Sequence, residues 1–150
     1  MVSTHVLAQS DLFADLSTEQ LAKVASLAEE VTCAQGETLF KEGGPATHLF
    51  ILLEGRVAVQ VQLTSRPGRI TTTSLSQAGQ MVGWSGFVPP RHYTASAVCE
   101  ADCRLLAIPG DDLMQLLEQH PEMGFLVMRR AAEIISGRLR NIQQFVLTTM

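Results

Sequence analysis

The sequence predicts a mostly β domain: an eight-stranded jelly roll flanked by helices and followed by a long C-terminal helix. Two changes of hydrophobic period indicate this architecture. Apolar residues recur at helical spacing up to about residue 30, alternate from residue 31 to residue 108, and return to helical spacing from residue 111. Glycines separate the short apolar runs of the middle segment, as turns between short antiparallel strands require. We expect one domain over residues 1–150.

The N-terminal helices are expected over about residues 10–30. Ser17 and Gln20 have the spacing of a capping box, in which each side chain bonds the backbone N–H of the other residue. Leu16 and Leu21 flank the box as a hydrophobic staple. A helix should therefore begin at Ser17.

Five segments of the β-roll, residues 31–108, can be assigned as strands from their pattern. Residues 49–53 are apolar on both faces, which predicts a central strand. Residues 57–63 alternate as a half-exposed strand does, and the Thr-rich residues 70–75 follow a turn. Residues 94–100 and 103–108 have the pattern of two further strands.

The C-terminal helices are expected over residues 111–148, with Asp111 as the first N-cap. The last helix carries a heptad pattern of apolar residues. These candidate dimer-helix residues are Phe125, Met128, Ala132, Ile135, Leu139, Ile142 and Val146. A narrow apolar seam of this kind favours a parallel homodimer through the C-terminal helix; the alternative is that the helix packs on its own barrel.

Composition limits the function classes. The net charge of −4 favours no direct nucleic acid binding, and no apolar run approaches the roughly 18 residues that span a bilayer, so no membrane partner is expected. Three cysteines without framework spacing indicate a reducing, cytoplasmic location and buried thiols. Their spacing matches neither a zinc finger nor a zinc ribbon, so we predict no metal site.

Residues 79–97 form the candidate ligand site. This stretch holds the only Trp and the only Tyr of the chain, three of its eleven glycines and an adjacent Pro pair. Glycines allow backbone amides to approach a ligand closely. The aromatic rings could stack on a planar ligand, and core filling is the competing interpretation for Trp84.

Taken together, three segments resemble the cyclic-nucleotide-binding domain of catabolite-activator-type bacterial regulators. They are Leu12 to Ser17, residues 36–43 (GETLFKEG) and residues 49–57 (LFILLEGRV). The resemblance covers nearly the whole chain. It implies an eight-stranded jelly roll with flanking helices, a phosphate-binding cassette in residues 79–97, and a last helix that dimerises and can cover the ligand.

The cassette departs from the family pattern at both charged anchors. In the family a Glu holds the ribose hydroxyl and an Arg neutralises the cyclic phosphate; here Trp84 and Tyr93 stand at those places. Arg91 is either a shifted phosphate ligand or a solvated loop residue. The candidate ligand-binding residues are Val82, Gly83, Trp84, Ser85, Arg91, Tyr93, Thr94 and Ala95.

We therefore expect a non-enzymatic small-ligand sensor, a regulatory module that does not bind cAMP in the usual way. Its ligand would be a cyclic nucleotide or another small planar anion. The alternative is a degenerate, ligand-free dimerisation or docking module. Haem and iron–sulfur use is disfavoured because the histidines are scattered and the cysteines do not cluster near the N-terminus. No Ser-His-Asp or paired-carboxylate constellation indicates an enzyme.

Overall fold

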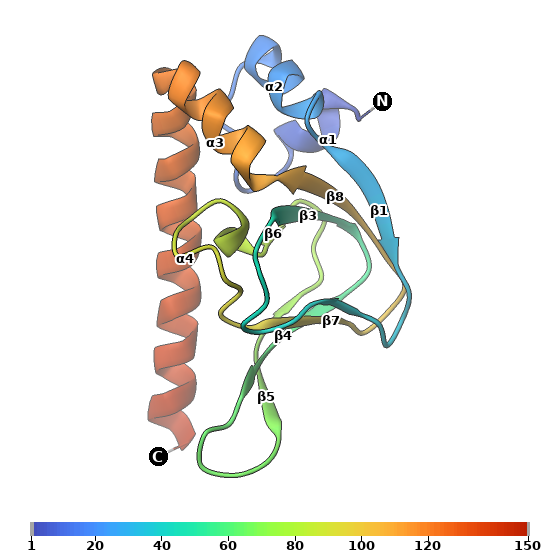
Figure 1. Cartoon of the computed structure of the whole chain (residues 1–150), viewed down its shortest axis with the longest axis vertical. Coiled ribbons are helices and arrows are strands. Elements are labelled where there is room, and N and C mark those ends of the chain that lie inside the picture. Colours follow the sequence, from blue (N-terminus) through green and yellow to red (C-terminus); the bar gives the residue numbers. More distant parts are fainter. Residues whose placement is uncertain (1, 150) are drawn as a thin grey trace.

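The computed structural model describes residues 2–149 and has two four-stranded antiparallel sheets (Figure 1). The first has the order β1 (Glu29–Cys33), β8 (Cys103–Pro109), β3 (His48–Glu54) and β6 (Met81–Val82). The second has the order β2 (Thr38–Phe40), β7 (Ser96–Cys99), β4 (Val57–Gln62) and β5 (Arg69–Leu75). The predicted eight-stranded roll with a long C-terminal helix is confirmed.

Strand β3 shows why the sequence of this segment is apolar on both faces. It lies inside the first sheet, where Phe50 is opposite Ala107 of β8 and Val82 of β6. Leu49 and Ile51 face the core under the helices, and Phe50 and Leu52 face the core between the two sheets. Because each face is covered, alternation with polar residues is absent, and the prediction of a central strand is confirmed.

The N-terminal region contains two short helices, α1 (Thr4–Ala8) and α2 (Thr18–Ala25). The capping box forms as predicted: the Gln20 N–H donates to Ser17 Oγ at 3.2 Å, and the Ser17 N–H donates to Gln20 Oε1 at 2.9 Å. The predicted range of residues 10–30 is wrong at both ends. Helix α1 precedes it, and β1 begins at Glu29 because this segment pairs with β8, where Glu29 is opposite Ala107.

The C-terminal helices are α3 (Gly110–Gln119) and α4 (Pro121–Thr149), close to the predicted range. The prediction of Asp111 as N-cap is wrong. Pro109 is the cap residue and makes no side-chain cap bond, while Asp111 lies in the first helical turn. Its carboxylate instead forms an ion pair with Arg91.

Helix α4 runs along the whole side of the roll in Figure 1 and has two apolar stripes. One stripe is buried against the barrel and consists of Met123, Val127 and Ala131, with Arg138 at its C-terminal end. The other follows part of the predicted heptad set: Phe125 is 63% exposed, Leu139 54% and Val146 44%. The heptad residues Met128, Ile135 and Ile142 are half-buried, and Ile142 lines a cavity against the barrel. The helix therefore packs on its own barrel and still presents an apolar surface, which we call the heptad seam.

The three thiols belong to the core between the two sheets. Cys33 and Cys103 are opposite each other on β1 and β8, and all three cysteines are buried and reduced. Burial is the main cause that raises the pKa of the Cys99 thiol. Within residues 2–149, no helix is both long enough and apolar enough to cross a bilayer.

Candidate functional site

A cavity of about 170 Å³ lies between the second sheet, the segment that joins β6 to β7, and α4. Figure 1 shows this connecting segment, in yellow-green, beside the middle of α4. The lining is formed by Phe40, Val59, Val61, Thr72, Thr73, Gly83, Trp84, Ser85, Tyr93, Thr94, Ala95, Arg138 and Ile142. Aromatic and aliphatic groups predominate, with hydroxyls and one guanidinium as the polar groups.

Gly83 is the residue that turns the chain into the cavity wall. Its φ of +80° lies in the left-handed region, which side chains other than glycine rarely adopt. A Cβ atom at this position would also lie 3.0 Å from Cε2 of Phe40 and 3.3 Å from Cε1 of Tyr93. Both the backbone conformation and the space therefore require glycine here.

The short 3-10 helix η1 (Trp84–Gly86) follows Gly83 and carries Trp84. Gly86 packs directly on β3, since a Cβ there would lie 2.2 Å from the carbonyl carbon and oxygen of His48. Trp84 is half-buried: it packs against the core under the helices and also lines the cavity. Both interpretations of Trp84 from the sequence, core filling and cavity lining, are therefore compatible with its position.

Tyr93 forms the opposite wall together with Phe40. The two rings are stacked, with centroids 3.8 Å apart and planes 13° from parallel. The Tyr93 hydroxyl donates to the backbone oxygen of His48 at 2.7 Å. Burial raises the pKa of Tyr93, so the phenol remains a neutral donor at physiological pH. The Tyr93 hydroxyl is thus engaged with the backbone, while the ring faces the cavity.

Helix α4 closes the cavity with Ile142 and Arg138. Arg138 is 9% exposed. Its guanidinium carbon lies 5.7 Å from the centre of the Trp84 ring, within cation–π range, and its Nη2 donates to the backbone oxygen of Met81. The closing helix therefore brings a positive charge to the cavity wall.

Six of the eight predicted ligand-binding residues line this cavity: Gly83, Trp84, Ser85, Tyr93, Thr94 and Ala95. Val82 and Arg91 do not. Val82 is buried in β6, between the sheets. Arg91 adopts a positive φ of 68° and pairs with Asp111 at the start of α3, away from the lining residues. Arg91 is therefore not positioned as the shifted phosphate ligand.

The sequence analysis missed the walls that come from other elements. Phe40, Val59, Val61, Thr72 and Thr73 line the cavity from β2, β4 and β5, and their alternation resembles that of any half-buried strand. The unusual position of Arg138 could have been recognised in the sequence. It continues the buried helical stripe of Val127 and Ala131 at helical spacing, where an apolar residue is expected.

Residues 30–120 match the sequence profile of the cyclic nucleotide-binding domain. The chain belongs to this family. A Geobacter metallireducens protein described as cyclic nucleotide-binding is 32% identical, with a TM-score of 0.80 over 93% of this chain and 99% of that chain. A cyclic nucleotide-binding domain from Methylobacillus flagellatus has a TM-score of 0.83 and 24% identity over 98% of this chain and 82% of its own.

Among full-length relatives of this cyclic nucleotide-binding domain is a CRP-like cAMP-activated global transcriptional regulator of Mycobacterium tuberculosis. It is 22% identical over 96% of this chain and 63% of the regulator. A potassium channel protein of Rhodopseudomonas palustris is 25% identical over 92% of this chain and 32% of its own length. The chain therefore spans less than two thirds of these relatives.

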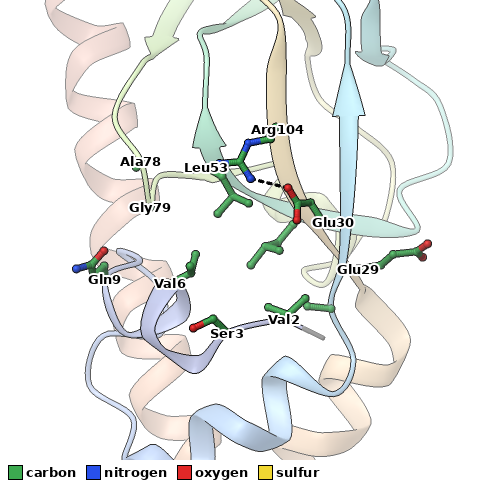
Figure 2. Close-up of a pocket in the computed structure, with 12 residues that line it drawn as sticks. Val2, Ser3, Val6, Gln9, Glu29, Glu30, Leu53, Ala78, Gly79 and Arg104 are labelled. Carbon is green, nitrogen blue, oxygen red and sulfur yellow. Dashed lines mark hydrogen bonds and ion pairs between the residues drawn. The ribbon is translucent and has the colours of Figure 1, made fainter.

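A second, larger hollow of about 540 Å³ lies beside the N-terminal segment (Figure 2). It is lined by Val6 and Gln9 of the N-terminal region, by Leu53, and by Arg104 and Glu30. Arg104 pairs with Glu30 inside the hollow and with Glu54 beside it. Glu29 also lines the hollow and has no ion pair within 4 Å among residues 2–149, so carboxylates outnumber the single arginine here.

The groups that line the cavity can stack on a ligand or hydrogen-bond to it. The lining contains hydroxyls, aromatic rings and one guanidinium. No carboxylate, imidazole or thiol of residues 2–149 lines it. These absent groups are the usual general acids and bases. Within residues 2–149, no group of three His, Cys, Asp or Glu side chains is arranged so that it could hold a metal ion.

Proposed function

We propose that this cyclic nucleotide-binding domain is a non-enzymatic sensor that binds a small planar ligand in the cavity and relays its presence through α4. One observation carries the proposal: Arg138 and Ile142 of α4 form part of the cavity lining. A ligand in the cavity would therefore touch the helix that also bears the heptad seam. The absence of general acids and bases from the lining supports a binding role.

The ligand that best fits these walls is flat. Trp84 on one side and the Tyr93–Phe40 stack on the other offer ring faces for a planar group, and Thr94 and Ser85 offer hydroxyls. Trp84 and Tyr93 stand where the family has its Glu and Arg. Each missing charged hydrogen bond removes about 1.5–3 kcal/mol, so cAMP in its usual family pose would bind weakly.

The size of the cavity supports a relay to α4. Sites for small molecules typically enclose about 300–1,000 Å³, whereas this cavity encloses about 170 Å³. A nucleotide-sized ligand would fit only if a wall moved. The C-terminal part of α4 is the wall best able to move, because its exposed residues beyond Ile142 contact little of the barrel. Two positions of this helix, with different ligand affinity, are what a sensor requires.

The heptad seam supports pairing with a second copy through α4. Phe125, Ala132, Leu139 and Val146 recur every seven residues and are exposed, while Met128 and Ile135 lie half-buried beside them. Exposed apolar residues with this repeat are typical of a coiled-coil interface. The seam also favours a second candidate function, that of a dimerisation or docking module that binds no ligand.

Trp84 allows the two functions to be distinguished. We expect its fluorescence and the melting temperature to change when cyclic mononucleotides, cyclic dinucleotides or other planar anions are titrated into the protein. The cavity-filling variant Ala95→Leu should lose both responses, while Ala34→Leu, at an exposed turn outside the lining, should keep them. A protein that responds to no member of the panel would favour the ligand-free module.

The pairing of α4 is tested separately by light scattering. We expect the protein to have the mass of a dimer, and Leu139→Glu to give a monomer because it places a charge in the heptad seam. Gln144→Glu adds the same charge on the other side of the helix and should leave the dimer intact. A wild-type monomer at high micromolar concentration would contradict the proposal.

A further inference from the structure

The guanidinium of Arg138 is the one charged group in the lining of the closed cavity. The residue is nine-tenths buried, and burial lowers the pKa of its guanidinium by penalising the charged form. An arginine stays protonated in a folded protein, so the side chain keeps its charge. A buried charge of this kind is costly unless a group of opposite charge compensates it.

No carboxylate of residues 2–149 lies within 4 Å of Arg138, and the longer-range attraction of Asp11 compensates its charge only in part. Every ion pair within 4 Å involves another arginine, such as Arg130 with Asp15. Asp11 attracts Arg138 only at longer range, since its carboxylate oxygens accept from the Met81 N–H at 3.1 and 3.3 Å. Arg138 itself is hydrogen-bonded through Nη2 to the oxygen of Met81, a neutral group.

The remaining donors of Arg138 are therefore free for another partner. A guanidinium carries five N–H groups in a planar fork, and the Nε and Nη1 of Arg138 have no hydrogen-bond partner within residues 2–149. Both atoms are accessible to solvent, so water can bond them until a ligand displaces it. This fork matches two oxygens of a phosphate or carboxylate. The Trp84 ring beneath the guanidinium helps to hold the fork in place.

We infer that Arg138 is the anchor for the anionic group of the ligand, a planar ring carrying a phosphate or carboxylate oxyanion. The inference rests on the proposed sensor function and adds the charge that the ligand must carry. An anchor on α4, rather than on the loop between β6 and β7, means that the ligand charge acts directly on the helix. Helix α4 would then be drawn toward the cavity only by a charged ligand.

The test compares charged ligands with their uncharged counterparts. Cyclic AMP and cyclic GMP are measured beside adenosine and guanosine, and benzoate is measured as the carboxylate; chloride keeps the ionic strength equal. Binding is followed by Trp84 fluorescence and by calorimetry in the wild type and in Arg138→Gln. Arg140→Gln is the matched control, since Arg140 lies on the same helix, bonds only Ser136 and does not line the cavity.

We expect at least one of these anions to bind the wild type. In Arg138→Gln the Kd of that anion should rise by roughly 10- to 100-fold, because a charged hydrogen bond is lost. Arg140→Gln should keep the wild-type Kd. Arg138→Lys keeps the charge without the planar fork and should recover part of the affinity. It also serves as the test variant if Arg138→Gln does not fold, because its Kd should still exceed that of the wild type.

Two outcomes would overturn the inference, and they differ in what they mean for the proposed function. If an anion binds the wild type and Arg138→Gln equally, or if an uncharged nucleoside binds the wild type as tightly as its cyclic nucleotide, the cavity is a ligand site and Arg138 is not its anchor. If neither the anions nor the nucleosides bind the wild type, the inference and the sensor function fail together. A response to phosphate compounds but not to benzoate would identify the oxyanion as a phosphate.

Discussion

The two hollows of the molecule each contain an arginine, and they differ in how its charge is compensated. In the larger hollow of Figure 2, Arg104 pairs with Glu30 and Glu54, and all three side chains are about half-exposed or more. In the closed cavity, Arg138 is buried and has no carboxylate within 4 Å among residues 2–149. Arg138 therefore lacks the close carboxylate partners that Arg104 has.

The largest effect on stability is expected at Gly86, in the short helix η1 that carries the cavity residue Trp84. Gly86→Ala would place a Cβ 2.2 Å from the His48 carbonyl, so η1 would have to move away from β3. We expect the free energy of unfolding to fall by about 3 kcal/mol or more, as for severe overpacking. Urea denaturation followed by circular dichroism measures it.

A matched glycine on α4 controls for the substitution itself. At Gly137 the nearest atom to an added Cβ is Nη2 of Arg140 at 3.8 Å. Gly137→Ala should stabilise the protein by about 0.5–1 kcal/mol, because alanine loses less backbone entropy in a helix. Wild-type stability in Gly86→Ala would show that η1 is not held against β3.

An intermediate effect is expected from a paired arginine that joins α4 to the N-terminal region. Arg130 donates to both carboxylate oxygens of Asp15 at 2.8 Å, and this pairing lowers the pKa of Asp15 to about 2. A folded pKa below the usual 3.8 stabilises the protein above about pH 4, and this contribution is lost as the pH falls toward 2.

The measurement is the melting temperature of the wild type and of Asp15→Asn between pH 2 and pH 7. The variant should melt earlier at neutral pH, and the two curves should converge near pH 2. An unchanged difference across this range would mean that the ionised Asp15 does not contribute through its pairing.

The smallest effect is expected in the larger hollow. Arg104→Gln removes both ion pairs, but its partners are exposed, so water compensates them. We expect a melting temperature within experimental error of the wild type. A clear loss of stability would remove the contrast between the two hollows, because compensation by exposed partners would then matter for the fold.

Much of the fold was predictable because burial repeats along the chain. The apolar run in residues 49–53 reflects a strand that is covered on both faces. The alternating sequence of residues 57–62 also identified a strand, although Val57 and Ala58 are both buried. The start of β1 was not predictable, since Glu29 and Glu30 are exposed charged residues whose strand conformation comes from pairing with β8. Local propensity contains no information on that partner.

The cavity was predictable only on its loop side. Gly83 and Trp84 stand out by residue type, whereas Thr72 and Val61 line the cavity because of how the second sheet curves. The role of Arg91 could not be inferred from its neighbours, because a positive φ turns its side chain toward Asp111. Arg138 lies 54 residues from Trp84 and reaches it only through the docking of α4.

The two apolar stripes of α4 have a thermodynamic consequence. One stripe lies against the barrel and reaches the cavity, and the other is the heptad seam on the same rigid helix. If ligand binding changes the affinity of one copy for another by some factor, dimerisation must change ligand affinity by that same factor. If two copies pair through this seam, the dissociation constant of that dimer would itself report ligand binding, without any label in the cavity.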